Sequence, residues 1–211
     1  MSRAIAEVQT PGRRLRSEAK KTAILDAAEA LFVAEGYERA SVDAIAARAG
    51  VSKRTVYDHF GEKSAIFLRA LGRVNDAVTE TIRAAIDEEL TPGRDLREAL
   101  TAFAGRVVTQ TFPSSDYATF QRLTSQRWSA PQLPAAARDR PERMLEDCFA
   151  ELAATQALRA PDPSLAARHF TALTIGLALG TLDTPHGHGP DEAEVAQIIS
   201  DGVDAFLRAY R

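Results

Sequence analysis

The sequence predicts an all-α protein. No segment alternates apolar and polar residues for long enough to form a strand, and apolar residues recur instead at helical spacing. Prolines and glycines punctuate these periodic segments, as at Thr91-Pro92-Gly93. With 45% hydrophobic residues among 211, the chain can bury a real core, as one large domain or as two small ones.

The expected helices are bounded by caps and breaks along the chain. They cover residues 17–35, 42–49, 53–60, 63–89, 94–111, 115–128, 134–157, 162–182 and 191–210. The first buries apolar positions such as Ile24 and Phe32 and ends at Gly36. The later breaks are rich in proline or glycine, at residues 113–115, 131–134, 160–163 and 185–190.

The second and third helices form the most informative motif, within residues 41–67. Ser41 and Ser52 are natural N-caps, since their hydroxyls can accept hydrogen bonds from the free amides of a first turn. Gly50 supplies the backbone freedom that the end of the second helix requires. The pattern predicts two short helices joined by a tight turn and followed at once by a longer helix.

The third helix has an outer face suited to DNA. Its inner face would be Val56 and Phe60, and its outer face combines cations, a hydroxyl and an aromatic ring: Lys53, Arg54, Thr55, Tyr57 and His59. Such side chains are what a helix in the major groove needs. The plain alternative is an ordinary solvated face on which the aromatic groups serve as packing or capping groups.

Two runs carry a family resemblance. They are Ile24-Leu25-x-Ala27-Ala28-x-x-Leu31-Phe32-x-x-x-Gly36-Tyr37 and Ser41-Val42-x-x-Ile45-Ala46-x-x-Ala49-Gly50-Val51-Ser52-x-x-Thr55-Val56-Tyr57-x-His59-Phe60-x-x-Lys63. Over residues 18–68 the chain thereby resembles the tetracycline-repressor (TetR) family of bacterial regulators. The stretch from Phe120 to Leu177 is similar to the AefR-like C-terminal subgroup, through Trp128, Pro134, Arg143 and Ala166-Ala167-Arg168.

The resemblance implies a set of DNA-binding residues: Ser41, Ser52, Lys53, Arg54, Thr55, Tyr57, His59 and Lys63. We expect Arg54 to contact a base, because a guanidinium pairs bidentately with guanine. Lys63 opens the fourth helix, where a lysine and the helix N-terminus can both hold a phosphate. Glu62 departs from the family pattern, which has a small capping residue there; a carboxylate can cap but also repels phosphate.

The charge distribution favours DNA binding at the N-terminal end. The net charge is −3, but residues 1–65 hold 11 basic and 9 acidic residues, whereas residues 66–211 hold 15 and 20. Much of the basic excess precedes or begins the first helix, as Arg13, Arg14, Arg16, Lys20 and Lys21. The segment is either a solvated tail or an arm that follows phosphates, in which case its binding weakens with salt.

The expected organisation is a flexible basic arm (1–16), a helix-turn-helix domain (17–65) and an effector-binding and dimerisation domain (66–211).

Gly176 and Gly180, four residues apart, lie on one helix face and permit a close helix approach, either inside the chain or across a two-fold interface. The resemblance implies a homodimer through the last two helices. The expected interface residues are Gly176, Gly180, Val195, Ile199, Val203 and Phe206, with Ile198 and Leu207 on the same apolar stripe.

Large or polarizable side chains are frequent between residues 103 and 173. They are Phe103, Val107, Phe112, Tyr117, Phe120, Trp128, Met144, Cys148, Phe149, His169, Phe170 and Leu173. The plain interpretation is core packing, and His169 then is a satisfied core histidine. The resemblance implies a ligand cavity here, and the scarcity of Lys and Arg among these residues favours a small apolar ligand.

Several functional classes are disfavoured. The single cysteine, Cys148, rules out an internal disulfide, and His186 and His188 lack the further ligands of a metal site, so no metal or cofactor is expected. No signal peptide, membrane span or catalytic motif is visible, which predicts a cytoplasmic protein that is not an enzyme. The sequence therefore predicts a homodimeric repressor that a small apolar ligand releases from a palindromic double-stranded DNA operator.

Two alternatives remain at this point. The chain could be a DNA-binding regulator without a small-molecule effector, controlled by a protein partner or constitutive. An enzyme with a helical fold is the weaker alternative. A titration of operator binding with ligands distinguishes a regulator without an effector from the ligand-responsive repressor. Any catalytic turnover of a substrate would favour the enzyme.

Overall fold

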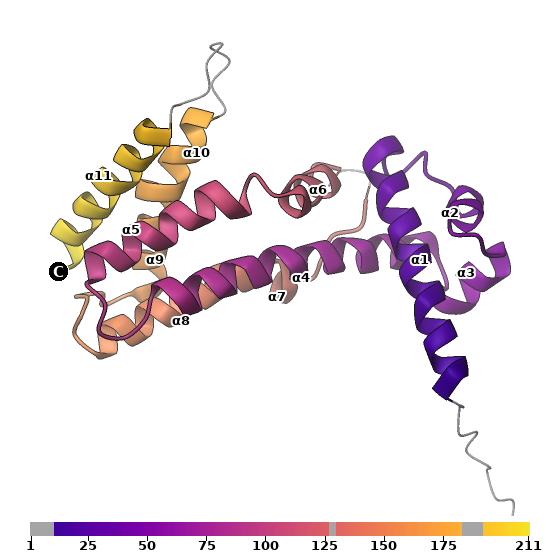
Figure 1. Cartoon of the computed structure of the whole chain (residues 1–211), viewed down its shortest axis with the longest axis horizontal. Coiled ribbons are helices and arrows are strands. Elements are labelled where there is room, and N and C mark those ends of the chain that lie inside the picture. Colours follow the sequence, from indigo (N-terminus) through magenta and orange to yellow (C-terminus); the bar gives the residue numbers. More distant parts are fainter. Residues whose placement is uncertain (1–10, 127–129, 183–191) are drawn as a thin grey trace, which may run out of the picture. The chain divides into compact units, whose positions relative to one another are not determined.

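A computed structural model describes residues 11–126, 130–182 and 192–211, and within these ranges every regular element is a helix (Figure 1). The elements are α1 (Pro11–Glu35), α2 (Val42–Arg48), α3 (Lys53–Phe60), α4 (Lys63–Glu89), α5 (Leu96–Arg106), η1 (Val107–Thr111), α6 (Ser115–Thr124), α7 (Ala135–Arg138), α8 (Arg140–Ala154), α9 (Pro163–Thr171), η2 (Ala172–Gly176), α10 (Leu177–Leu182) and α11 (Glu192–Tyr210). The all-α prediction is confirmed.

The clearest differences from the expected helix boundaries are at two places. α1 is helical from Pro11, the first residue that the structure describes, and not only from Ser17. Residues 11–16 are therefore helical and do not form a flexible arm. The helix expected over 134–157 is divided at Asp139, and Pro141 stands in the first turn of α8.

The chain divides into two compact units. The first consists of residues up to Arg73 together with Thr119–Leu133, and the second of Val74–Ala118 together with Pro134–Arg211. Both α4 and α6 contribute residues to each unit. The boundary expected after residue 65 falls in the same helix as the observed one, but the sequence did not indicate that residues 119–133 join the first unit.

The core of the first unit is small and well packed. Ile24, Ile45 and Val56 are fully buried, so α1, α2 and α3 share one apolar centre. The ring of Phe67, from α4, packs edge-on against Phe32 with their centroids 5.1 Å apart. The start of α4 is thereby fixed to the helices that precede it.

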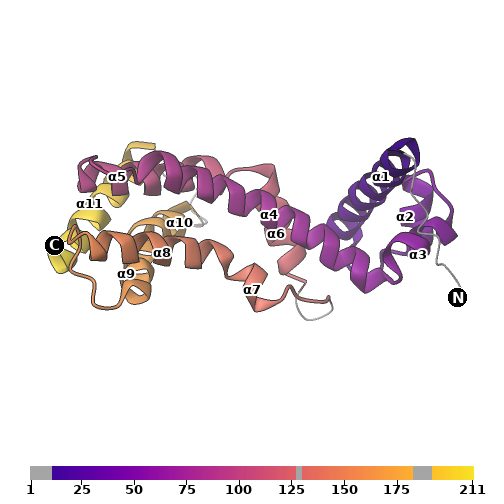
Figure 2. The same ribbon diagram turned by 90° about the horizontal axis from the view of Figure 1, so that it is seen from below.

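The core of the second unit is built around aromatic rings. Phe103, Phe149, Phe170 and Phe206 are buried, and Phe149, Phe170 and Phe206 lie with ring centroids 5.5 to 5.6 Å apart. They come from α5, α8, α9 and α11, and both views show α11 beside α5 (Figures 1 and 2). Val195, Ile199 and Val203 of α11 are buried in the same cluster. The apolar stripe of α11 therefore faces its own chain.

A close helix approach in the second unit occurs at Gly202, which the sequence analysis did not single out. A Cβ atom at this position would lie 2.1 Å from the carbonyl oxygen of Leu173. Gly202 is what allows α11 to lie directly against η2. At Gly180 a Cβ atom meets nothing within 4 Å, and at Gly176 its nearest neighbour is the carbonyl oxygen of Thr171 at 3.4 Å.

Gly202→Ala should destabilise the protein, because the added methyl group overlaps backbone that cannot withdraw cheaply. We expect the free energy of unfolding in urea to fall by about 1–3 kcal/mol. Gly105→Ala in α5 is the matched control, since nothing lies within 4 Å of its Cβ position; it should be neutral or stabilising by about 0.5–1 kcal/mol. Equal effects of the two substitutions would contradict the close approach at Gly202.

Candidate nucleic-acid interface

The expected helix-turn-helix is present as α2 and α3. The Ser41 hydroxyl caps α2 by accepting from the amide of Ala44 at 3.1 Å, and the Ser52 hydroxyl caps α3 by accepting from the amide of Thr55 at 3.1 Å. Gly50 turns the chain between them with a φ of +65°. Ser41 and Ser52 thus shape the motif first, and any DNA contact they make adds to this capping role.

The outer face of α3 carries Arg54 as its most accessible cation. Its side chain is 90% exposed, and its nearest carboxylate is Asp58 at 3.9 Å. Lys53 is more constrained, because its ammonium pairs with Asp43 of α2 at 2.9 Å, which also raises the pKa of Lys53. Tyr57 is exposed, while Thr55 and His59 are half-buried. Of the predicted contact residues, Arg54 and Tyr57 are the best placed to meet a nucleic acid.

Lys63 has a different role from the one expected. Its ammonium donates to the carbonyl oxygens of Tyr37 at 2.9 Å, Glu38 at 3.3 Å and Ala40 at 3.3 Å. It also lies 4.4 Å from the centre of the Tyr37 ring. Three contacts use all three donors of an ammonium group. In this structure Lys63 therefore braces the loop between α1 and α2 and is not directed toward a phosphate.

Neighbouring polar groups complete the start of α4. The carboxylate of Glu62 accepts a hydrogen bond from the hydroxyl of Ser64. Glu62 thus has a local hydrogen-bonding role at the position where the family pattern has a small capping residue. Its negative charge still faces solvent, since the residue is exposed.

A glutamine clamps the end of α1, and sequence reasoning missed it. The side-chain oxygen of Gln126 accepts from the amide of Tyr37 at 2.7 Å, and its side-chain nitrogen donates to the carbonyl of Phe32 at 3.0 Å. The last carbonyl groups of a helix have no hydrogen-bond partner within the helix. Gln126 therefore provides hydrogen bonds to backbone groups at the end of α1. The partners are separated by about ninety residues, so no local pattern could have indicated the clamp.

The basic residues near the N-terminus belong to α1. Arg16 and Lys20 are exposed, and Lys21 pairs with Glu18 at 2.9 Å. Arg13 and Arg14 lie in the first turns of α1, where side chains are not described. The expected phosphate contacts from this segment would therefore come from a helix rather than from a flexible arm.

The residues predicted to line a ligand cavity have different surroundings in the part of the chain that the structure describes. Phe103, Val107, Phe149 and Phe170 are core, and Phe112 packs edge-on against Tyr117 with their centroids 4.5 Å apart. Met144 and Leu173 are half-buried, Phe120 belongs to the first unit, and Trp128 lies outside the described residues. His169 is exposed, and its Nδ1 is hydrogen-bonded to the Tyr210 hydroxyl at 2.7 Å. The aromatic side chains were a signal of core packing.

A partly open pocket of about 370 Å³ lies elsewhere in the second unit, between the turn after α4, the start of α5 and the end of α8. Cys148 is the predicted cavity residue that lines it. The other lining residues are Leu90, Thr91, Pro92, Gly93, Arg94, Leu96, Ala99, Glu151, Leu152, Thr155 and Ala157. Sequence reasoning treated Thr91-Pro92-Gly93 only as a helix stop.

The residues predicted for a dimer interface separate into two groups. Val195, Ile199, Val203 and Phe206 are buried within their own chain, so their side chains are not available to a partner. Gly176 and Gly180 are exposed, and Leu177 between them is 54% exposed. Close packing against the described part of the chain therefore does not explain these glycines.

The described residues contain neither a cluster of metal ligands nor a membrane-spanning helix. Among the described residues no three His, Cys, Asp or Glu side chains cluster as metal ligands would, and His186 and His188 lie outside those residues. None of the described helices combines the length and the apolar character needed to cross a bilayer.

Comparison with known proteins gives two matches to family models. Residues 24–70 match the model for bacterial regulatory proteins of the tetR family, and residues 98–211 match the model for the C-terminal domain of AefR-like transcriptional repressors. The second match alone covers more than half of the chain.

Curated relatives are regulators of transcription. The chain is 38% identical over 92 residues to the HTH-type transcriptional activator FasR of Mycolicibacterium smegmatis, which covers 44% of this chain and 42% of that protein. It is 34% identical over 93 residues to the HTH-type transcriptional repressor BepR of Brucella suis, which covers 43% and 44%. The matched part thus spans less than half the length of either relative.

Solved structures share the fold over nearly the whole chain. A putative TetR-family regulator from Mesorhizobium loti is 23% identical, with a TM-score of 0.73 and coverage of 92% of this chain and 98% of that one. The flavonoid-responsive regulator FrrA is 27% identical, with a TM-score of 0.74 and the same coverage.

Arg54→Ala should lower DNA affinity by about 1–3 kcal/mol and relax one base preference, because an exposed guanidinium on α3 would be lost. Unfolding stability should not change, since the side chain is almost fully exposed. The measurement is a binding-site selection combined with fluorescence anisotropy. Unchanged affinity and site profile would remove Arg54 from the interface.

Lys63→Met, unlike Arg54→Ala, should lower the stability of the free protein. Loss of the hydrogen bonds to the carbonyls of Tyr37, Glu38 and Ala40 should lower the free energy of unfolding by about 1–3 kcal/mol. Thermal and urea unfolding without DNA provide the measurement. If Lys63→Met unfolds like the parent and loses only DNA affinity, the lysine is a phosphate contact and not a brace.

Proposed function

Since the chain belongs to the tetR family of bacterial regulatory proteins, and is thus a DNA-binding regulator of transcription rather than an enzyme, we propose the following finer function. It is a homodimeric repressor in the cytoplasm that leaves a near-palindromic operator when a small, largely apolar effector binds. The observation that carries the DNA-binding part is the capped α2–α3 pair, which presents the exposed Arg54.

The exposed surface of η2 and α10 supports the homodimer. Gly176, Leu177 and Gly180 lie within about one turn of each other and form an exposed apolar strip, with Ala172 one turn before. Small residues allow helices of two chains to approach closely, and Leu177 supplies apolar area to bury. A single short recognition helix reads few bases, so two copies related by a two-fold axis are needed for a specific site.

The connections between the two units support regulation by a ligand. α4 and α6 each run through both units, so a change at their ends in the second unit can reach the first unit without a separate relay. The segment after α6 contains Gln126, which holds the end of α1. The similar regulator FrrA is described as flavonoid-responsive, which favours a small molecule as the effector class. A ligand acting in this way couples two sites through one helix.

Gly180→Leu should convert the dimer into a monomer, because the side chain would occupy the space where a partner helix packs. We expect the fold to tolerate the change, since nothing in the described part of the same chain lies within 4 Å of the Cβ position. We expect light scattering to report the monomer and specific operator affinity to fall at least about tenfold. Gly105→Leu, at another helical glycine with open space, is the control. A dimer with normal affinity would place Gly180 outside the interface.

Induction is tested by titrating a preformed operator complex with a library of apolar compounds. The proposal predicts that some of them release the operator and raise the melting temperature of the protein. Release only by multiply charged metabolites would contradict an apolar effector. Release by none, with tight operator binding intact, would favour a regulator without a small-molecule effector.

A further inference from the structure

The pocket beside the α4–α5 turn has an apolar wall and few polar groups. Leu90, Pro92, Leu96, Ala99 and Leu152 are apolar residues that line it. Its volume of about 370 Å³ is within the usual range for small-molecule sites. Leu90 directly follows the last residue of α4, so an occupant would contact the end of the helix that begins in the DNA-binding unit.

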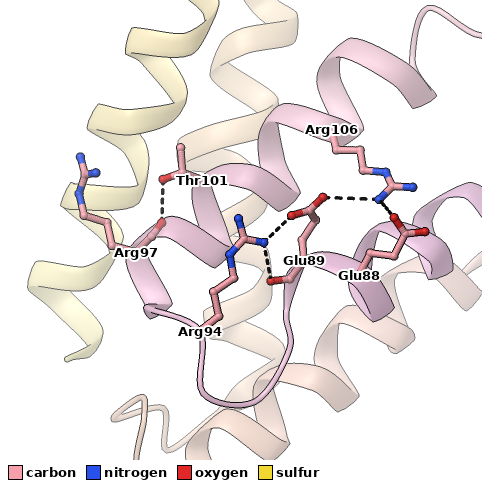
Figure 3. Close-up of polar contacts among 6 residues, drawn as sticks. All are labelled: Glu88, Glu89, Arg94, Arg97, Thr101 and Arg106. Atoms are coloured by element: carbon pink, nitrogen blue, oxygen red, sulfur yellow. Dashed lines mark hydrogen bonds and ion pairs between the residues drawn. The ribbon is translucent and has the colours of Figure 1, made fainter.

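The cations next to this pocket are already paired. α4 ends in Asp87, Glu88 and Glu89, at the negative end of the helix dipole. Arg106 pairs with Glu88 at 2.5 Å and with Glu89 at 3.5 Å, and Arg94 pairs with Glu89 at 2.5 Å while also donating to its backbone carbonyl at 3.3 Å (Figure 3). The guanidinium groups therefore offset the acidic end of α4.

Glu151 is the acidic group that remains on the pocket wall. It lines the pocket from α8, and no Lys or Arg of the described chain forms an ion pair with it. Burial raises the pKa of the neighbouring Cys148 thiol to about 11, and the negative charges of Glu151 and Asp87 add to that shift. The thiol thus responds to a negative local potential, which disfavours an anion and favours a cation in the same space.

We propose that this pocket binds the effector, and that the effector is a small apolar molecule carrying a positively charged nitrogen that pairs with Glu151. This inference rests on the proposed ligand-responsive function and specifies its ligand class. The apolar part of the ligand fills the space between Leu90, Leu96 and Leu152, and the charged nitrogen lies at the α8 side. An anionic ligand would instead meet Glu151 with no free cation beside it.

The single cysteine makes pocket occupancy measurable in the intact protein. Cys148 lines the pocket, so an occupant should slow its alkylation by iodoacetamide at a fixed pH. The probes are three molecules with the same chain: octylamine, which is protonated at neutral pH, octanol and octanoate. We expect octylamine to protect Cys148 at concentrations roughly three- to tenfold lower than octanol, and octanoate to protect least.

Glu151→Gln separates the charge preference from apolar binding. In this variant octylamine should lose its advantage over octanol, while protection by octanol stays unchanged. Glu142→Gln is the matched control, because Glu142 is an exposed glutamate in the first turn of α8 and does not line the pocket. Octanoate protecting best, or an octylamine preference that survives Glu151→Gln, would overturn the ligand class.

Operator release, measured on the same samples, distinguishes this inference from the proposed function. Compounds that release the operator without protecting Cys148 would overturn the assignment of the effector to this pocket and leave ligand-responsive regulation in place. Protection of Cys148 with the expected charge preference but no operator release would support the pocket and its ligand class, and would contradict induction through it.

Discussion

The ammonium group of Lys63 is the contact on which the DNA-binding unit most depends. It stands at the first residue of α4 and donates to the carbonyls of Tyr37, Glu38 and Ala40, in the loop that leads into α2. That loop sets the direction in which α2 begins, and the pair of Lys53 with Asp43 then ties α3 to α2. The orientation of the recognition helix is therefore linked, by a short series of contacts, to the beginning of α4.

Two further features make that link relevant to regulation. α4 continues past Arg73 into the second unit and ends at the acidic residues that Arg94 and Arg106 neutralise. Gln126 provides a second attachment to the end of α1, from the segment that follows α6. A ligand that changes the end of α4 would thus act on a helix whose other end carries Lys63. Such an effect requires the ligand to bind the two conformations with different affinity.

The parts of the structure that could be predicted from the sequence are those that neighbouring residues determine. Ser41, Gly50 and Ser52 define caps and a turn through neighbouring residues only, so the α2–α3 motif and the all-α class could be predicted. The direction of the Lys63 side chain could not, because its partners lie more than twenty residues away. The Gln126 clamp and the close approach at Gly202 depend on distant pairings in the same way.

The pocket beside the α4–α5 turn was not indicated by the sequence, for a related physical reason. The aromatic side chains between residues 103 and 173 were compatible with core packing or with cavity walls, and Phe103, Phe149 and Phe170 fill the interior of the second unit. Space remains instead where the chain turns between α4 and α5, in a pocket that Thr91, Pro92 and Gly93 line together with residues of α8. Composition thus predicted an apolar ligand, and the packing adds a pocket that composition did not indicate.

The central claim is that two copies of α3 read a two-fold symmetric DNA site. Mapping the bound sites across the genome of the source organism tests it most directly. The account predicts a shared motif made of two inverted half-sites, with centres about one helical turn, or a multiple of it, apart. A bound motif without inverted repetition, or binding without any shared motif, would contradict it.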